Sequence, residues 1–169
     1  AAIEEAVSIY RELAAARPKA VWPDLASSLT NLSACLSDLG RAPEALAAIE
    51  EAVAIRWKLA AARPEAVRPD LAGSLTNLSA CLSALGHAPE ALVAAREAVS
   101  IYRELAVWPD LAASLTNLSN CLSAVERAPE ALEAIEEAVA IRRELAAARP
   151  DAVRPDLAGS LNNLSLHLS

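Results

Sequence analysis

The sequence predicts an all-α fold, a right-handed superhelical solenoid of stacked antiparallel helix pairs. The first observation is repetition: a segment that begins at Pro23 returns almost letter for letter from Pro69 and Pro109, and begins again at Pro155. Self-similarity at a long, nearly constant period is typical of stacked repeat architectures. The second observation is composition: Ala and Leu dominate, Phe and Met are absent, and there are only four Gly. Ala and Leu are strong helix formers, so the repeat is expected to be helical.

The first half of each repeat has the features of an amphipathic helix. Pro23 and Asp24 suit a helix start, because the missing proline N–H would be unused there and the helix dipole favours an anion. Leucines then recur at spacings of 4, 3, 4 and 3 from Leu25 to Leu39, which makes one apolar stripe. Gly40 is expected as the residue that ends the helix. We name this element helix A and expect it at 23–39, 69–85, 109–125 and 155–168.

The second half of each repeat predicts another helix, which we name helix B. Pro43 and Glu44 open it in the same manner, and acidic residues come early while basic residues come late, as the helix dipole favours. Pro64 is expected to end it, and residues 64–68 are expected to form a connector. Helix B is therefore predicted at 1–16, 43–63, 89–106 and 129–149, and each repeat is a helical hairpin.

The repeats predict one continuous array over residues 1–169. Its expected parts are helix B of a partial repeat at 1–22, repeats at 23–68, 69–108 and 109–154, and helix A of a partial repeat at 155–169. Residues 103–111 lack six residues that the matching stretch 11–25 contains. We expect this deletion to shorten helix B of that repeat and to tighten its connection. The array, which lacks an initial Met, is expected to be a module of a larger protein.

The recurring residues resemble those of the tetratricopeptide repeat family, a helix–turn–helix repeat. The resemblance rests on Asn-Leu-Ser at 31–33, Gly40 at the turn, Glu44-Ala45 at the start of helix B and Ala52 near its middle. The same set recurs in the next two repeats, with Glu126 in place of the turn glycine. The long period and the Ile-[Arg/Tyr]-x-x-Leu run resemble the kinesin-light-chain type.

The resemblance implies a scaffold for protein or peptide binding whose concave groove is lined by helix A. Carried onto this sequence, the expected groove residues are mainly small and polar. They are Ser27, Thr30, Asn31, Ser37, Thr76, Asn77, Ser83, Thr116, Asn117, Asn120, Ser123, Asn162 and Asn163. No Lys or Arg falls at these positions, which counts against a ligand held by its terminal carboxylate.

Four asparagines at one repeat position, Asn31, Asn77, Asn117 and Asn163, are the leading candidates for recognition. We name them the Asn ladder. A carboxamide both donates and accepts hydrogen bonds, so a row of them suits the backbone of an extended peptide. The alternative is structural: each Asn bonds a neighbouring helix and ties the repeats together.

Other functional classes find little support in the sequence. The net charge of −7 disfavours nucleic acid, which needs a cationic surface. No apolar run is long enough to cross a membrane and no signal peptide is evident, so a cytoplasmic location is expected. No catalytic grouping, phosphate-binding loop or cofactor motif is present, so the chain is not expected to be an enzyme or to carry a cofactor.

The cysteines are predicted to be structural. Cys35, Cys81 and Cys121 share one repeat position, which His167 occupies in the last repeat. Equivalent positions on packed helices are too far apart for a disulfide, and tight metal geometry disfavours a zinc site. We therefore expect small, buried apolar side chains.

A structural role is the competing hypothesis for the whole chain. The sequence starts with a helix B and ends with a helix A, so the two ends are complementary. Repeat arrays without capping helices expose apolar faces at their ends. A head-to-tail contact between such ends that does not close into a ring adds further copies and forms a filament. The array would then be a spacer or a self-associating element.

Overall fold

The computed structural model describes residues 2–168, and within them it consists of eight α-helices and no strand. The predicted all-α fold of paired helices is thereby confirmed. The helices are α1 (Ala2–Ala16), α2 (Pro18–Asp38), α3 (Ala42–Ala60), α4 (Pro64–Ala84), α5 (Ala88–Leu105), α6 (Trp108–Ala124), α7 (Ala128–Ala148) and α8 (Pro150–His167). Even-numbered helices correspond to helix A and odd-numbered helices to helix B.

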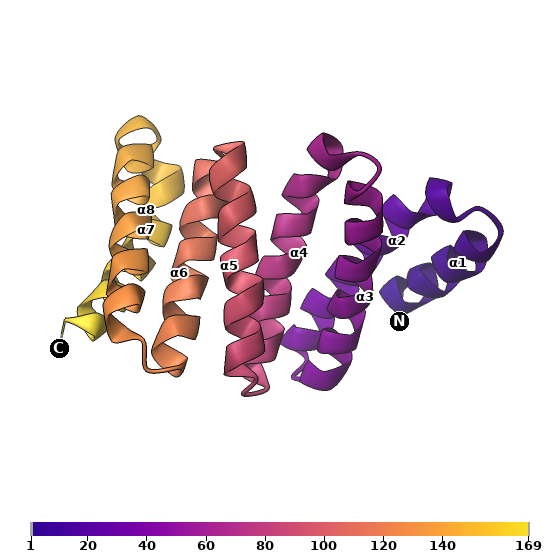
Figure 1. The fold of residues 1–169 in the computed structure, drawn as a ribbon, viewed down its shortest axis with the longest axis horizontal. Coiled ribbons are helices and arrows are strands. Elements are labelled where there is room, and N and C mark those ends of the chain that lie inside the picture. Colours follow the sequence, from indigo (N-terminus) through magenta and orange to yellow (C-terminus); the bar gives the residue numbers. More distant parts are fainter. Residues whose placement is uncertain (1, 169) are drawn as a thin grey trace. The chain divides into compact units, whose positions relative to one another are not determined.

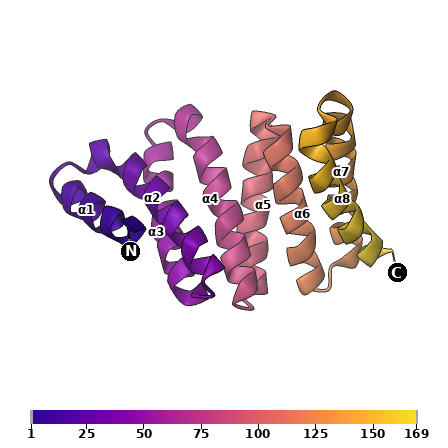
Figure 2. The same ribbon diagram turned by 180° about the vertical axis from the view of Figure 1, so that it is seen from behind.

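The helices form two compact units, unit 1 with residues 1–87 and unit 2 with residues 88–169. In unit 1, α2 packs between α1 and α3, while α4 packs on α3 and also touches α2. In unit 2, α6 packs between α5 and α7, and α8 packs on α7. Consecutive helices within each unit run antiparallel in both views (Figure 1, Figure 2). The single continuous array with its repeat boundaries stays a prediction.

Three of the four A helices begin five residues earlier than predicted. Helix α2 begins at Pro18, so Pro23 lies inside it. The same holds for α4 and α8, so the expectation that residues 64–68 form a connector is wrong. The early prolines sit at the first helical position, where an N–H is not needed. Pro23 is exposed, so water can reach the carbonyl that lacks its helical donor.

The six-residue deletion shortens helix A, which was not predicted, and helix B of the same repeat is also shorter than α3 and α7, as predicted. Helix α6 has 17 residues, whereas α2 and α4 have 21 each. Helix α5 has 18 residues, whereas α3 has 19 and α7 has 21. The connection has two residues, Ala106 and Val107, so it is shorter than the three residues between α3 and α4 but longer than Arg17, which alone joins α1 to α2. The deletion therefore removes the turn that precedes the inner proline in the other A helices.

Small residues let the helices of each hairpin approach closely. Ala26 of α2 and Ala45 and Ala52 of α3 are fully buried. The leucine stripe of α2 covers them: Leu25 and Leu29 are buried, whereas Leu39 follows the helix and is 70% exposed. The same small positions are buried in unit 2 at Ala112, Ala131 and Ala138. Recurring alanines thus allow close helix packing in both units.

Candidate functional site

A hollow of about 320 Å³ lies between the A helices α2 and α4 of unit 1. The predicted groove residues Ser37 and Asn77 both line it, one from each helix. Its remaining lining is mostly small, and Asp38 contributes the only charged side chain on it. The other lining residues are Ser33, Ala34, Ala42, Ala80, Cys81 and Ala84. Alanines at the crossing keep the two helices close without filling the space between them.

A buried serine and a buried cysteine hold the floor of this hollow together. The Ser33 hydroxyl donates to the Ala45 carbonyl at 2.8 Å, and its oxygen lies 3.6 Å from the Cys81 sulfur. Ser37 lies 3.7 Å from the same sulfur. Hydroxyl and thiol groups therefore tie helix A to its own helix B and to the next helix A, which satisfies polar groups that burial would otherwise penalise.

Unit 2 repeats this tie with different chemistry. The Ser119 hydroxyl donates to the Ala131 carbonyl at 2.8 Å, and its oxygen lies 3.0 Å from His167 Nε2. Because the serine proton is used by the carbonyl, His167 Nε2 must donate to Ser119. His167 occupies the repeat position of Cys81, so an imidazole performs the thiol's packing role.

The predicted groove threonines are largely engaged by their own helices. Thr30, Thr76 and Thr116 each donate to the carbonyl four residues earlier, at 2.9, 3.1 and 3.0 Å. All three are half-buried. Such back-bonding satisfies the hydroxyl within the helix, so these oxygens can act toward a ligand chiefly as acceptors.

Two arginines that were not among the predicted groove residues reach between the A helices from helix B. Arg56 is buried and donates to Thr30 at 2.8 Å and to Ser74. Arg142 makes the equivalent bonds to Thr116, at 2.8 Å, and to Ser160. Burial lowers the pKa of Arg142, and the nearby charge of Asp156 opposes that shift.

The signal for these arginines was the Ile-[Arg/Tyr] position, where Tyr10 and Tyr102 alternate with Arg56 and Arg142. A position that accepts either side chain indicates a long group that packs its stem and offers a polar tip. The tip bonds hydroxyls of two successive A helices. The side chain therefore joins three helices.

The Asn ladder is divided between the units. Asn31 and Asn77 of unit 1 are exposed, whereas Asn117 and Asn163 of unit 2 are half-buried. The remaining predicted groove residues are exposed, and two of them bond carbonyls of their own helix: Ser27 to Pro23 and Ser123 to Ser119, both at 3.0 Å. The other exposed members are Ser37, Ser83, Asn120 and Asn162.

The prediction of buried cysteines is right for two of the three. Cys81 and Cys121 are 7% and 1% exposed, but Cys35 is exposed. Ser33 and Ser37 of α2 lie against the Cys81 sulfur, whereas Cys35 lies on α2 itself. All three are free thiols, and no group of three or more His, Cys, Asp or Glu among residues 2–168 is placed to hold a metal ion.

Sequence profiles decide the family. Profiles of the tetratricopeptide repeat match residues 25–59 and 70–144, which together cover most of the chain. The chain belongs to the tetratricopeptide repeat family. Repeats of this family form protein-interaction scaffolds, which confirms the resemblance and the general class of function. No curated protein sequence matches the chain.

Solved tetratricopeptide repeat structures share this fold. BtubC (BKLC) from P. vanneervenii matches with a TM-score of 0.71 and 20% identity, over 98% of this chain and 63% of that one. The nearly identical repeats of a Podosopora anserina protein named for kinesin light chain match with a TM-score of 0.61 and 22% identity, over 98% and 87%. A variant of that protein matches with a TM-score of 0.62 and 22% identity, over 98% of this chain and 86% of that one. The chain thus spans less than two thirds of BtubC.

Proposed function

We propose that the chain is a non-enzymatic binding module that holds an extended peptide segment of a partner protein along its A helices. The observation that carries this proposal is the hollow between α2 and α4, which two predicted groove residues line from opposite sides. A cytoplasmic location completes the proposal. No helix among residues 2–168 is long and apolar enough to cross a membrane.

The lining of the hollow suits a peptide backbone with small or basic side chains. The Asn77 carboxamide can donate to a peptide carbonyl and accept from a peptide N–H. Alanines such as Ala34 and Ala80 let the backbone approach. Asp38 adds a negative charge, and no Lys or Arg lines the hollow. A ligand held by a terminal carboxylate would find no cation in this lining.

A library of random peptides displayed on phage tests the groove while the natural ligand is unidentified. Peptides enriched on the chain should lose binding to the Asn77→Ala, Asn117→Ala double variant, while circular dichroism shows unchanged helical content. Ala80→Trp should also block binding, because the indole fills the hollow. Glu136→Gln, on the exposed surface of α7, serves as the control. Undiminished binding to both groove variants would refute the proposal.

A second candidate function is head-to-tail self-association, and the exposure of the terminal helices favours it. Leu161 of α8 and Leu168, which follows that helix, are 37% and 67% exposed. The equivalent residues Leu29 and Leu36 of α2 are 0% and 4% exposed, because α3 covers them. At the other end, Ile9 of α1 is 50% exposed, whereas the equivalent residues of α3 and α5 are buried. A second copy could bury both faces.

Sedimentation velocity over a range of concentrations tests this second candidate. Self-association predicts a sedimentation coefficient that rises with concentration for the 169-residue chain. The rise should disappear in Ile9→Glu or Leu168→Glu, because a charge on either face cannot be buried without a partner. A chain that stays monomeric at the highest concentration would exclude stacking. Peptide binding in the groove would be unaffected by that result.

A further inference from the structure

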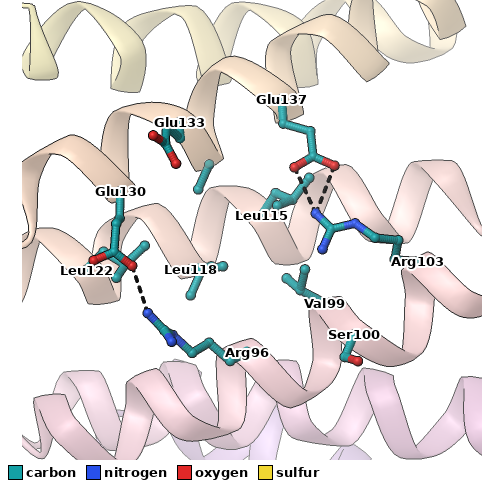
Figure 3. A pocket seen from close by; sticks show the side chains of 11 residues that line it. Arg96, Val99, Ser100, Arg103, Leu115, Leu118, Leu122, Glu130, Glu133 and Glu137 are labelled. Atoms are coloured by element: carbon teal, nitrogen blue, oxygen red, sulfur yellow. Dashed lines mark hydrogen bonds and ion pairs between the residues drawn. The ribbon is translucent and has the colours of Figure 1, made fainter.

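A second hollow, on the helix B side of unit 2, has no part in the proposed groove. It has a volume of about 330 Å³ and lies between α5 and α7, above α6 (Figure 3). We name it the α5–α7 slot. Its walls come from Arg96, Ser100 and Arg103 of α5 and from Glu130, Glu133 and Glu137 of α7. None of these residues belongs to the predicted helix A groove.

The floor of the α5–α7 slot is apolar. Leu115 and Leu122 of α6 and Val99 of α5 lie beneath it, and they are only 1%, 2% and 4% exposed. Leu118 lies between the two buried leucines and is half-buried, so part of its side chain faces the open slot (Figure 3). Covering this surface with an apolar group would remove further apolar area from water, which is favourable.

Two ion pairs bridge α5 and α7 at the ends of the slot. Arg96 contacts Glu130 at 2.9 Å, and Arg103 contacts both oxygens of Glu137, at 2.9 and 2.8 Å (Figure 3). The two arginines are two helical turns apart, or about 10 Å along α5 at 1.5 Å per residue. That axial spacing of the two arginines is similar to the diameter of one α-helix with its side chains, roughly 10–12 Å.

One carboxylate on the rim of the slot has no ion pair among the described residues. Glu133 lies between the two bridges on α7, and within residues 2–168 it has no ion pair (Figure 3). Its repeat equivalent in unit 1 is Ala47, so the first hairpins lack this carboxylate. Glu133 is therefore a feature of unit 2 and not a requirement of the repeat.

Within the lining of the slot, Arg96 and Arg103 are matched by Glu130 and Glu137. In unit 1, Arg41 sits between Glu4 and Glu44. In unit 2 the signs are reversed, and Glu130 sits between Arg96 and Arg127. One cation thus faces two anions in unit 1, and one anion faces two cations in unit 2. The carboxylate of Glu133 is the rim charge that remains for a ligand.

We propose that the α5–α7 slot receives one large apolar side chain from an amphipathic helix of a partner protein. The partner helix lies across the slot between the two ion pairs, and its apolar side chain covers Leu118. A Lys or Arg one turn away on that helix pairs with Glu133. This surface is independent of the helix A groove, so the chain can hold two partner segments on different faces.

Synthetic helical peptides of about 18 residues, long enough to be helical in water, provide the probe. One fluorescein-labelled peptide carries a stripe of Leu flanked by Lys, a second has Glu for every Lys, and a third has Ser for every Leu. Fluorescence anisotropy should show binding of the Leu–Lys peptide only. Raising the salt concentration should weaken that binding, because exposed charges are screened.

Variants of the chain locate the binding. Glu133→Gln should reduce the affinity for the Leu–Lys peptide by about three-fold, which is the effect of losing one exposed ion pair. Glu136→Gln removes the same charge from the same helix outside the slot and should change nothing. Ser100→Trp should abolish binding, because the exposed position can take an indole that fills the slot without altering the buried floor. Ala80→Trp, which blocks the helix A groove, should have no effect.

Several results would overturn the proposal. They are absence of binding by the Leu–Lys peptide, equal binding of the Leu–Glu peptide, or full binding to Ser100→Trp. Equal weakening by Glu133→Gln and Glu136→Gln would indicate a general charge effect and would also overturn it. Because the groove variant is measured in parallel, failure of the slot and failure of the groove can be told apart.

Discussion

Replacement of Glu126 by glycine should stabilise the chain, because this residue holds a backbone conformation that suits glycine. The turns after α2, α4 and α6 share one hydrogen-bond pattern. Arg41, His87 and Arg127 donate to the carbonyl five residues earlier, at 2.8, 2.9 and 2.9 Å. The preceding residue has a positive φ in each turn: 73° at Gly40, 79° at Gly86 and 61° at Glu126. Glu126 therefore occupies a left-handed position that its side chain disfavours.

The expected gain is the difference between two effects. A non-glycine residue in the left-handed region costs about 1–2 kcal/mol. Glycine also lowers the stability by roughly 0.4–1 kcal/mol, because it increases the conformational entropy of the unfolded chain. Glu126 is exposed, and an added Cβ at Gly40 or Gly86 would meet nothing within 4 Å, so packing adds no further effect. The net expectation is a stabilisation of about 0.5–1 kcal/mol, or roughly 2–3 °C in Tm for a chain of this size.

Thermal unfolding followed by circular dichroism measures this effect. Glu126→Gly should raise Tm, and Gly40→Ala and Gly86→Ala should lower it by a similar amount. Glu126→Ala removes the charge but keeps the left-handed strain, so its Tm should stay close to that of the parent. If Glu126→Gly left Tm unchanged, or if Glu126→Ala raised it equally, backbone strain would not be the cause.

Three further predictions concern single side chains. Cys35 should react with a thiol reagent in the native state, whereas Cys81 and Cys121 should react only on unfolding, because they are 7% and 1% exposed; equal rates for all three would contradict this. The hydrogen bond from Arg41 lowers the pKa of Glu44 below its usual 4.5, so the resulting stability is present above pH 4.5 and is lost as the pH falls through the lowered value. The Tm difference between the parent and Glu44→Gln should therefore vanish in acid, and a difference that persisted there would exclude this origin. Arg142→Met should lower stability by about 1–3 kcal/mol, because Thr116 and the buried Ser160 lose a donor. Arg142→Tyr introduces the residue found at the equivalent position 102. Its free energy of unfolding, measured by chemical denaturation, should fall by less than that of Arg142→Met.

The number and order of the helices could be predicted from the sequence because the residues that start and end each helix act locally. Proline at the start of helix B and glycine or an equivalent residue at the turn act through the backbone of a few residues. The inner prolines gave wrong helix starts for the same reason. Pro23 satisfies the rule for a helix start, but Pro18 satisfies it too, and the residues between them continue the helix.

The features that were missed depend on neighbours distant in sequence. The exposure of Cys35 differs from that of Cys81 because only Cys81 lies beneath the hydroxyls of Ser33 and Ser37. Arg56 was expected in the late, basic part of helix B, yet its side chain bonds the hydroxyls of two A helices. Such contacts are set by the packing of successive repeats. The lack of an ion pair at Glu133 likewise emerges only when the partners of the surrounding arginines are known.

The most direct test of the proposed groove is a chemical-shift map of the ¹⁵N-labelled chain titrated with the tightest peptide from the phage library. Binding in the groove should give the largest amide and side-chain carboxamide shifts in the A helices of unit 1, at Asn31, Ser37, Asn77 and Ala80. Shifts confined to the B helices, or to the exposed apolar faces of α1 and α8, would contradict it.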